Sequence, residues 1–233
     1  MRSITRLLAV TALASVAVAP AAHAVLIVSG SVGGAPIGAT NYVNFNSLAL
    51  GNAGGNAGGL TIGFSGDAQV VTGALSGKYA APFLSNGNGA LFGTPDGADA
   101  TRYLSTGIGT VTMQMAGSMN YLGLLWGSVD SYNSLQFYSG ATLLGTVTGR
   151  NVIASPNGNQ GVNGTVYVNI TSDIAFDRVV ARSTGYAFEF DNVAYVSRPG
   201  PGGDGDPVSA PATLALFGAS LAGLAFARRY KSA

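Results

Sequence analysis

The sequence contains no cysteine and a single histidine, His23. The lack of cysteine excludes a disulfide framework, a thiol nucleophile, an iron–sulfur site and a zinc knuckle. Charged residues are also scarce, at 9% of the chain, and the formal net charge is +1. A balance so close to neutral gives no overall attraction for phosphate backbones, so we expect no nucleic-acid partner.

The N-terminal segment has the features of a secretory signal peptide. Two arginines precede residues 7–19, which form an uncharged and mostly apolar stretch too short to span a bilayer comfortably. Ala22 and Ala24 flank His23 in a small-x-small pattern, so we expect residues 1–24 to be removed after Ala24. The exported chain then lacks histidine as well as cysteine, which excludes Ser–His and Cys–His catalysis.

Residues 208–227 form a second apolar stretch, and this one contains no charged residue. A helix of this length rises about 30 Å, the thickness of the hydrocarbon core of a bilayer. Three basic residues follow in a tail, namely Arg228, Arg229 and Lys231. Because such basic residues stay in the cytoplasm, we expect a transmembrane helix in the inner membrane with the preceding domain on the far side.

A short motif precedes this stretch. Its residues are Val208, Ser209, Ala210, Pro211, Ala212 and Thr213. Together with the apolar stretch and the basic tail, residues 208–233 resemble a PEP-CTERM sorting signal, whose usual motif is Val-Pro-Glu-Pro-Ala-Thr. Ser209 and Ala210 replace the first proline and the glutamate of that motif. The resemblance implies sorting by exosortase, a membrane transpeptidase, and an association with exopolysaccharide or biofilm.

The chain between the two ends has the pattern of β-strands. Runs rich in β-branched and aromatic residues are separated by Gly, Asn, Asp and Ser, without a long helical period. The runs are residues 25–29, 42–45, 60–64, 68–72, 110–115, 121–126, 135–138, 142–147, 165–170, 174–181, 186–190 and 193–196. They predict one all-β domain over residues 25–196, an antiparallel β-sandwich or jelly roll, followed by a Gly/Pro linker over residues 197–207.

Local signals add detail to this prediction. The glycine-rich residues 51–59 lack the Lys-Ser/Thr of a phosphate-binding loop and are expected to form a flexible loop. Residues 139–140 and 163–164 are hairpin signals. The apolar alternation slips at residues 191–192, which predicts a bulge or turn. Residues 73–109 show no clear pattern.

Two blocks carry a second resemblance. Residues 123–133 are GLLWGSVDSYN and residues 186–195 are YAFEFDNVAY. They are similar to the central block and the last strands of a group of exosortase-dependent surface proteins. The resemblance implies a β-sandwich without established catalytic residues, so no active site is carried over.

Glu189 and Asp191 are the one pair of acids two residues apart in an expected strand, so both side chains share one face. Most glycosidases need only a pair of carboxyl groups for catalysis. Since strand charges usually stay exposed, we interpret this pair instead as a solvated edge that faces Arg178 or Arg182 across a hairpin.

Two further acidic pairs lie in expected loops, Asp96 with Asp99 and Asp204 with Asp206. Calcium needs six to eight oxygen ligands, and each pair alone supplies too few. We interpret the first pair as turn residues and the second as linker residues. A calcium site assembled from distant loops stays open, and no metal or cofactor is expected from the sequence.

The aromatic residues offer a candidate sugar site. Those able to stack on a sugar ring are Trp126, Tyr132, Tyr138, Tyr167, Tyr186 and Tyr195. Trp126 has the parity of Leu122 and Leu124 in its strand, which places it in the core. Tyr132 lies in a turn and is the better candidate for ligand contact.

The sequence therefore predicts a non-catalytic, exported cell-surface or extracellular-matrix protein. It is expected to be anchored by its C-terminal helix before exosortase processing and to reside at the cell surface or outside the cell afterwards. The alternative is a carbohydrate-binding module for extracellular polysaccharide. A secreted glycosidase is disfavoured because the acids are few and scattered.

Overall fold

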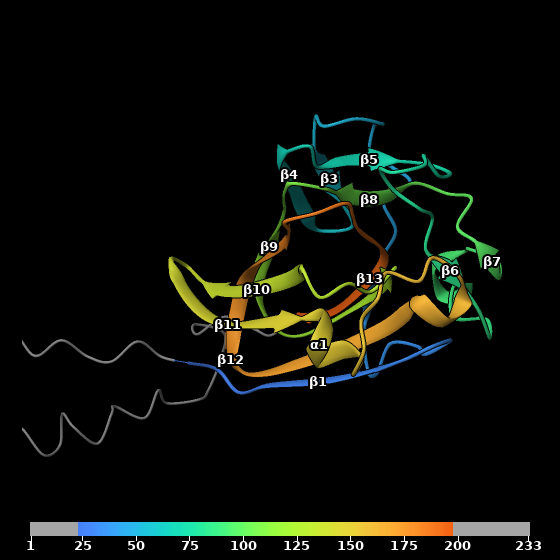
Figure 1. Cartoon of the computed structure of the whole chain (residues 1–233). Helices are drawn as coiled ribbons and strands as arrows, with labels where there is room; N and C mark the ends of the chain where they lie inside the picture. The colour runs from blue at the N-terminus through green and yellow to red at the C-terminus, as the bar shows by residue number, and fades with distance from the viewer. Residues whose placement is uncertain (1–22, 198–233) are drawn as a thin grey trace, which may run out of the picture.

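The computed structural model describes residues 23–197, and its regular secondary structure is mostly β-strand (Figure 1). The strands are β1 Leu26–Ser31, β2 Asn41–Val43, β3 Gly55–Ala57, β4 Leu60–Gly66, β5 Gln69–Val71, β6 Phe83–Leu84, β7 Gly97–Ala98, β8 Tyr103–Thr106, β9 Gly109–Gly127, β10 Asn133–Ser139, β11 Thr142–Thr148, β12 Val166–Ser183 and β13 Phe188–Ser197. The short helices are η1 Ala90–Phe92, α1 Gly149–Val152 and η2 Val162–Gly164. Every strand pairing is antiparallel, which confirms the all-β prediction.

Eleven strands form one sheet, whose main path runs β11-β10-β12-β9-β13-β8-β5. At the middle of this path, β9 and β12 pair in the same register on both sides of an irregularity near residues 171–178 of β12. The first half of β9 also pairs with β4, and the second half pairs with β13. In Figure 1, β1 lies at the bottom of the sheet and β5 and β8 lie at the top.

The main hydrophobic core is built on one face of the central strands of this sheet. Residues of both halves of β9 belong to it, namely Val111, Met113, Leu122, Leu124 and Trp126. They meet apolar residues of β12 and β13, including Val168, Phe176, Phe188 and Phe190. The alternating residues of each strand thus bury one face, which is the energetic basis of the fold.

A second apolar cluster covers the opposite face of β9, β12 and β13. Its members are Leu84, Phe92, Tyr121, Leu125, Tyr167 and Ala194. Leu84 and Phe92 come from residues 73–102, a long excursion between β5 and β8 that contains β6, η1 and β7. The second half of β9 is therefore buried on both faces, which explains its nearly continuous apolar sequence.

Several expected runs join into longer strands. Residues 110–115 and 121–126 are both parts of β9, and residues 165–170 and 174–181 belong to β12. The last two runs form β13. Irregular residues between the runs break the alternation without ending the strand, because the neighbouring strands keep pairing on either side of them.

Two of the local predictions are confirmed. Residues 139–140 connect β10 to β11, with Gly140 at φ 56. The predicted slip at residues 191–192 is a register shift between Asp191 and Ala194, with Asn192 at φ 52.

Two others are wrong. Residues 51–59 are not simply a loop, because β3 pairs with β4 around a turn at Gly58 and Gly59. Both turn glycines have positive φ, which glycine adopts without strain. Residues 163–164 do not form a hairpin, since they belong to η2, which leads into β12.

The expected sorting segments fall largely outside the described residues. The expected cleavage after Ala24 lies at the N-terminal end of the described residues, and the expected linker over residues 197–207 begins at their C-terminal end. The motif, the apolar stretch and the basic tail over residues 208–233 lie outside the described residues. Among residues 23–197, no helix has the length and apolar character required to cross a membrane.

Candidate functional site

A polar cleft of about 230 Å³ opens where the β9–β10 connection meets the start of β13. Its lining includes the side chains of Asp130, Tyr132, Asn157, Gln160, Tyr186 and Glu189. These residues come from three separate parts of the chain, and most of them end in a hydrogen-bonding group. Such a lining suits a ligand that is itself rich in hydroxyl or amide groups.

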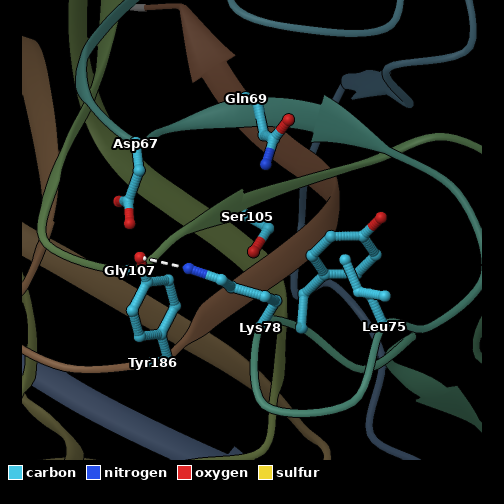
Figure 2. Close-up of a pocket in the computed structure, with 8 residues that line it drawn as sticks. Asp67, Gln69, Leu75, Lys78, Ser105, Gly107 and Tyr186 are labelled. Atoms are coloured by element: carbon cyan, nitrogen blue, oxygen red, sulfur yellow. Dashed lines mark hydrogen bonds between the residues drawn. The ribbon is translucent and has the colours of Figure 1, made fainter.

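A second hollow of about 160 Å³ adjoins this cleft, and Lys78 and Tyr186 line both (Figure 2). The Lys78 Nζ atom donates a hydrogen bond to the Tyr186 hydroxyl at 2.8 Å and lies 4.1 Å from the centre of its ring. This hydrogen bond raises the pKa of Lys78 above its ordinary value. The pair therefore forms a charged wall between the two hollows.

Glu189 is only 2% exposed, although it was expected in a solvated edge. Its Oε1 accepts a hydrogen bond from the Ala80 N–H at 2.8 Å, and its Oε2 accepts one from the Ser128 hydroxyl. Burial raises the pKa of Glu189 to about 7, although these two hydrogen bonds oppose the effect. The prediction of a solvated edge is wrong because residues 73–102 cover this face of β13.

The expected arginine partners of Glu189 and Asp191 lie elsewhere. The Arg178 guanidinium packs over the Tyr138 ring at 4.4 Å and donates to the Gly140 carbonyl. Arg182 lies in β12 opposite Ser134 of β10. Glu189 and Asp191 do share one face of β13, as expected from their spacing, and that face is buried.

Tyr132 occupies one wall of the cleft, half-buried, with its ring edge against Gly185. Its hydroxyl lies 2.6 Å from Asp130 Oδ2 and 2.7 Å from the Tyr186 carbonyl oxygen. The Tyr132 hydroxyl is the donor to both oxygens, which share its one proton. Burial, the larger cause, raises the pKa of Asp130 above its ordinary value, and the hydrogen bond from Tyr132 opposes this rise.

The other aromatic residues that could stack on a sugar are either buried in the core or partly exposed. Trp126 is fully buried and stacks on Phe188 at 4.3 Å, so its predicted core position is confirmed. Tyr167 and Tyr195 are buried as well. Tyr186 is 43% exposed and shares the cleft with Tyr132.

The first acidic loop pair does contribute to turns. Asp96 accepts hydrogen bonds from the Gly87 N–H at 2.9 and 3.2 Å. Asp99 accepts bonds from both the N–H and the hydroxyl of Thr101, at 2.8 and 2.7 Å. Asp204 and Asp206 lie outside the described residues.

The sequence analysis did not single out several cleft residues, among them Lys78, Asn157 and Gln160. All three lie in connections without a strand pattern. Only the high proportion of Gly and Asn around them marks these segments as loops, and this signal does not show which loops meet.

No family model matches the chain, and a search of curated proteins found no similar sequence. Across residues 23–197, no three His, Asp or Glu side chains gather into a group that suits a metal ion. Functional interpretation therefore depends on the sorting features of the sequence and on the chemistry of the cleft.

Proposed function

We propose that this chain is a non-catalytic, exported cell-surface or extracellular-matrix protein, sorted by an exosortase and associated with exopolysaccharide or biofilm. The main support is the combination of proline-containing motif, apolar stretch and basic tail over residues 208–233. The antiparallel all-β domain supports it too, because it fits the β-sandwich or jelly roll that the second resemblance implies.

Removal of residues 208–233 is expected to convert a membrane-associated protein into a freely soluble exported one. Replacing Leu216 and Leu221 by arginine should have the same effect, because each arginine near the middle of a span costs roughly 2.5–3.5 kcal/mol. Cell fractionation measures the outcome. Membrane association that persists after deletion would contradict the proposed anchor.

Processing is tested separately in the same experiment. In a host with an active exosortase, the mature protein is expected to lack the tail, and Pro211→Ala should make the uncut form accumulate. The double change Ser209→Pro with Ala210→Glu rebuilds the usual motif and should increase cleavage. Intact mass spectrometry reads both results, and a full-length mass in every variant would remove the sorting proposal.

A second function is favoured by the cleft, namely binding of an extracellular carbohydrate. Tyr132 and Tyr186 offer ring surface, and Asp130, Asn157 and Gln160 offer acceptors and donors that match sugar hydroxyls. Ligand sites usually have a mostly apolar lining, so this polar cleft points to a hydrophilic ligand. Because two carboxyl groups line it, neutral sugars are expected to bind better than uronic acids.

The arrangement of Glu189 supports binding without catalysis. A glycosidase needs a carboxylic acid that is free to protonate the glycosidic oxygen. Both oxygens of Glu189 instead accept hydrogen bonds from the protein, from Ala80 and from Ser128. We therefore expect no release of reducing sugar from a bound polysaccharide.

Tyr132→Ala is expected to lower affinity for a neutral glycan identified on a glycan array by about tenfold or more. The change removes a ring contact with the sugar and the hydroxyl that holds Asp130 and the Tyr186 carbonyl in place, and a tenfold loss corresponds to about 1.4 kcal/mol. Titration calorimetry measures the change. Tyr138→Ala is the matched control, because Tyr138 is a half-buried tyrosine outside the cleft.

Retained folding of both tyrosine variants is checked by the fluorescence of Trp126, the single tryptophan of the chain. Equal affinity of Tyr132→Ala and wild type would contradict the cleft as the binding site. Absence of binding to every arrayed glycan would remove the carbohydrate function and leave the sorting proposal unaffected.

A further inference from the structure

The polar cleft and the smaller hollow beside it share one wall. Three residues line both of them, namely Lys78, Tyr79 and Tyr186. The two volumes are about 230 and 160 Å³, and each alone is smaller than the roughly 300–1,000 Å³ of a usual ligand pocket. Together they reach that range. The wall between them therefore decides how large a ligand the site can hold.

The Lys78 side chain is the movable part of this wall. It is exposed, and its Nζ atom donates to the Tyr186 hydroxyl at 2.8 Å and lies 4.1 Å from the centre of the Tyr186 ring. Tyr186 is the only hydrogen-bond partner of this ammonium group among residues 23–197. These contacts are a weak restraint at an exposed site, and the ammonium is carried on a flexible four-carbon side chain.

The backbone beneath Lys78 is held firmly. Leu75 and Tyr79 exchange two backbone hydrogen bonds, of 2.9 and 3.0 Å, and the Lys78 N–H donates to the Leu75 carbonyl at 2.9 Å. The Tyr79 ring packs edge-on against the buried Tyr103 ring, with 6.4 Å between their centres. The wall therefore opens by motion of the Lys78 side chain and not of the turn that carries it.

Lys78 covers an aromatic surface that is otherwise suited to a ligand. Tyr186 is 43% exposed, and its ring packs closely against Gly107, where an added Cβ atom would lie only 2.2 Å from the ring Cε1 atom. Its carbonyl oxygen accepts a hydrogen bond from the Tyr132 hydroxyl at 2.7 Å. A ring fixed in this way offers apolar contact area at little entropic cost once Lys78 leaves it.

Asp67 offers the ammonium group a second place. It lines the smaller hollow, and its Oδ1 atom is buried without a hydrogen-bond partner. Figure 2 shows its carboxylate directed towards the Lys78 ammonium and the Tyr186 hydroxyl. The hydrogen bond with Tyr186 is the largest cause that raises the pKa of Lys78, and the charge of Asp67 adds to it. Lys78 therefore keeps a counter-charge nearby when it leaves Tyr186.

We propose that the ligand of this site is an oligosaccharide of at least two sugar units, which displaces Lys78 from the Tyr186 ring and binds across both hollows. The inference rests on the proposed carbohydrate function and deepens it. One unit occupies the cleft beside Tyr132, and the next stacks on the uncovered Tyr186 ring. In the smaller hollow, Gln69 and Ser105 supply hydrogen-bonding groups for its hydroxyls. A single sugar fills only the cleft and leaves Lys78 in place.

The first test compares glycans of different length. The exported chain is applied to an array of neutral mono- to hexasaccharides of glucose, galactose, mannose and N-acetylglucosamine, and the series that binds best is titrated by calorimetry. Affinity is expected to rise about tenfold or more from one sugar unit to two or three. Equal affinity for one unit and for longer chains would overturn the inference.

The second test changes the cover and the ring separately. Lys78→Ala is expected to raise the affinity for the oligosaccharide about two- to fivefold, because no cation–π contact is then displaced on binding. Tyr186→Phe keeps the ring but loses the hydroxyl that holds Lys78, so it should also raise this affinity. Tyr186→Ala removes the ring and should lower it about tenfold. Arg182→Ala is the matched control, because Arg182 is an exposed base outside both hollows.

The outcomes separate this inference from the function on which it rests. If Tyr132→Ala lowers the affinity for every glycan length equally and wild type gains nothing from a second unit, the cleft remains a sugar site and the bridging ligand is refuted. A loss of oligosaccharide affinity in Lys78→Ala would identify Lys78 as a ligand contact and overturn its displacement. Absence of binding to every arrayed glycan would remove both proposals. Lys78→Ala alters only an exposed side chain, so it decides the matter even if a Tyr186 variant fails to fold.

Discussion

Replacement of Phe188 by alanine is expected to lower the free energy of unfolding by about 3–5 kcal/mol, the usual range for a buried phenylalanine. The side chain is fully buried at the start of β13. Its ring stacks on Trp126 at 4.3 Å and lies 5.2 Å from the Phe190 ring. Alanine would remove all of these contacts and leave a cavity that the close-packed core cannot fill.

The measurement is thermal or urea unfolding followed by the fluorescence of Trp126, which is the single tryptophan. For a domain of this size, the loss corresponds to a fall in melting temperature of roughly 6–20 °C. Leu91→Ala serves as the control, because Leu91 is 57% exposed and its truncation should have little effect. A Phe188→Ala variant as stable as the control would show that the aromatic cluster of Trp126, Phe188 and Phe190 does not stabilise the core.

The strand pattern of the sequence predicts much of this core. Trp126 was placed inside by its parity with Leu122 and Leu124, and the structure confirms it. Parity is informative there because successive side chains of a strand point to opposite faces. What parity does not reveal is that Tyr121 and Leu125, on the other face, are buried too.

The burial of that other face depends on residues 73–102, which show neither the helical nor the strand period. Their elements are very short, such as β6 and β7, and are held by turn bonds such as that of Asp96 to Gly87. Short elements of this kind leave no periodic signal in a sequence. For this reason Glu189 and Asp191 were expected in solvent, although the slip at residues 191–192 was predicted correctly.

Two tyrosines of the cleft, Tyr132 and Tyr186, were candidates from the sequence, and Tyr132 was preferred because a tyrosine in a turn between two strands is poorly placed for the core. Its partners come from connections far away in the sequence, including Lys78 and Gln160. Their meeting is a consequence of the fold and not of any local motif.

Glu189→Gln is expected to stabilise the protein in alkaline solution and to leave it unchanged in acid. In the unfolded chain a glutamate loses its proton near pH 4.5, whereas burial raises the pKa of folded Glu189 to about 7. Between these values the folded state binds more protons, so the free energy of unfolding falls as the pH rises. The contribution of protonated Glu189 to the free energy of unfolding is fully present below about pH 4.5 and is lost as the pH rises through about 7. The difference between the two pKa values corresponds to about 3 kcal/mol.

Glutamine is neutral at every pH and keeps both hydrogen bonds, since its oxygen can accept from Ala80 and its amide can donate to Ser128. Urea unfolding at pH 4 and pH 8 should therefore show equal stability at the lower pH. At pH 8 the variant should be more stable by about 3 kcal/mol. Asp96→Asn is the matched control, because its exposed carboxylate has no comparable burial and should preserve the wild-type pH dependence. A glutamine variant that loses stability between pH 4 and 8 as steeply as wild type would assign that loss to another buried acid, Asp191, and not to Glu189.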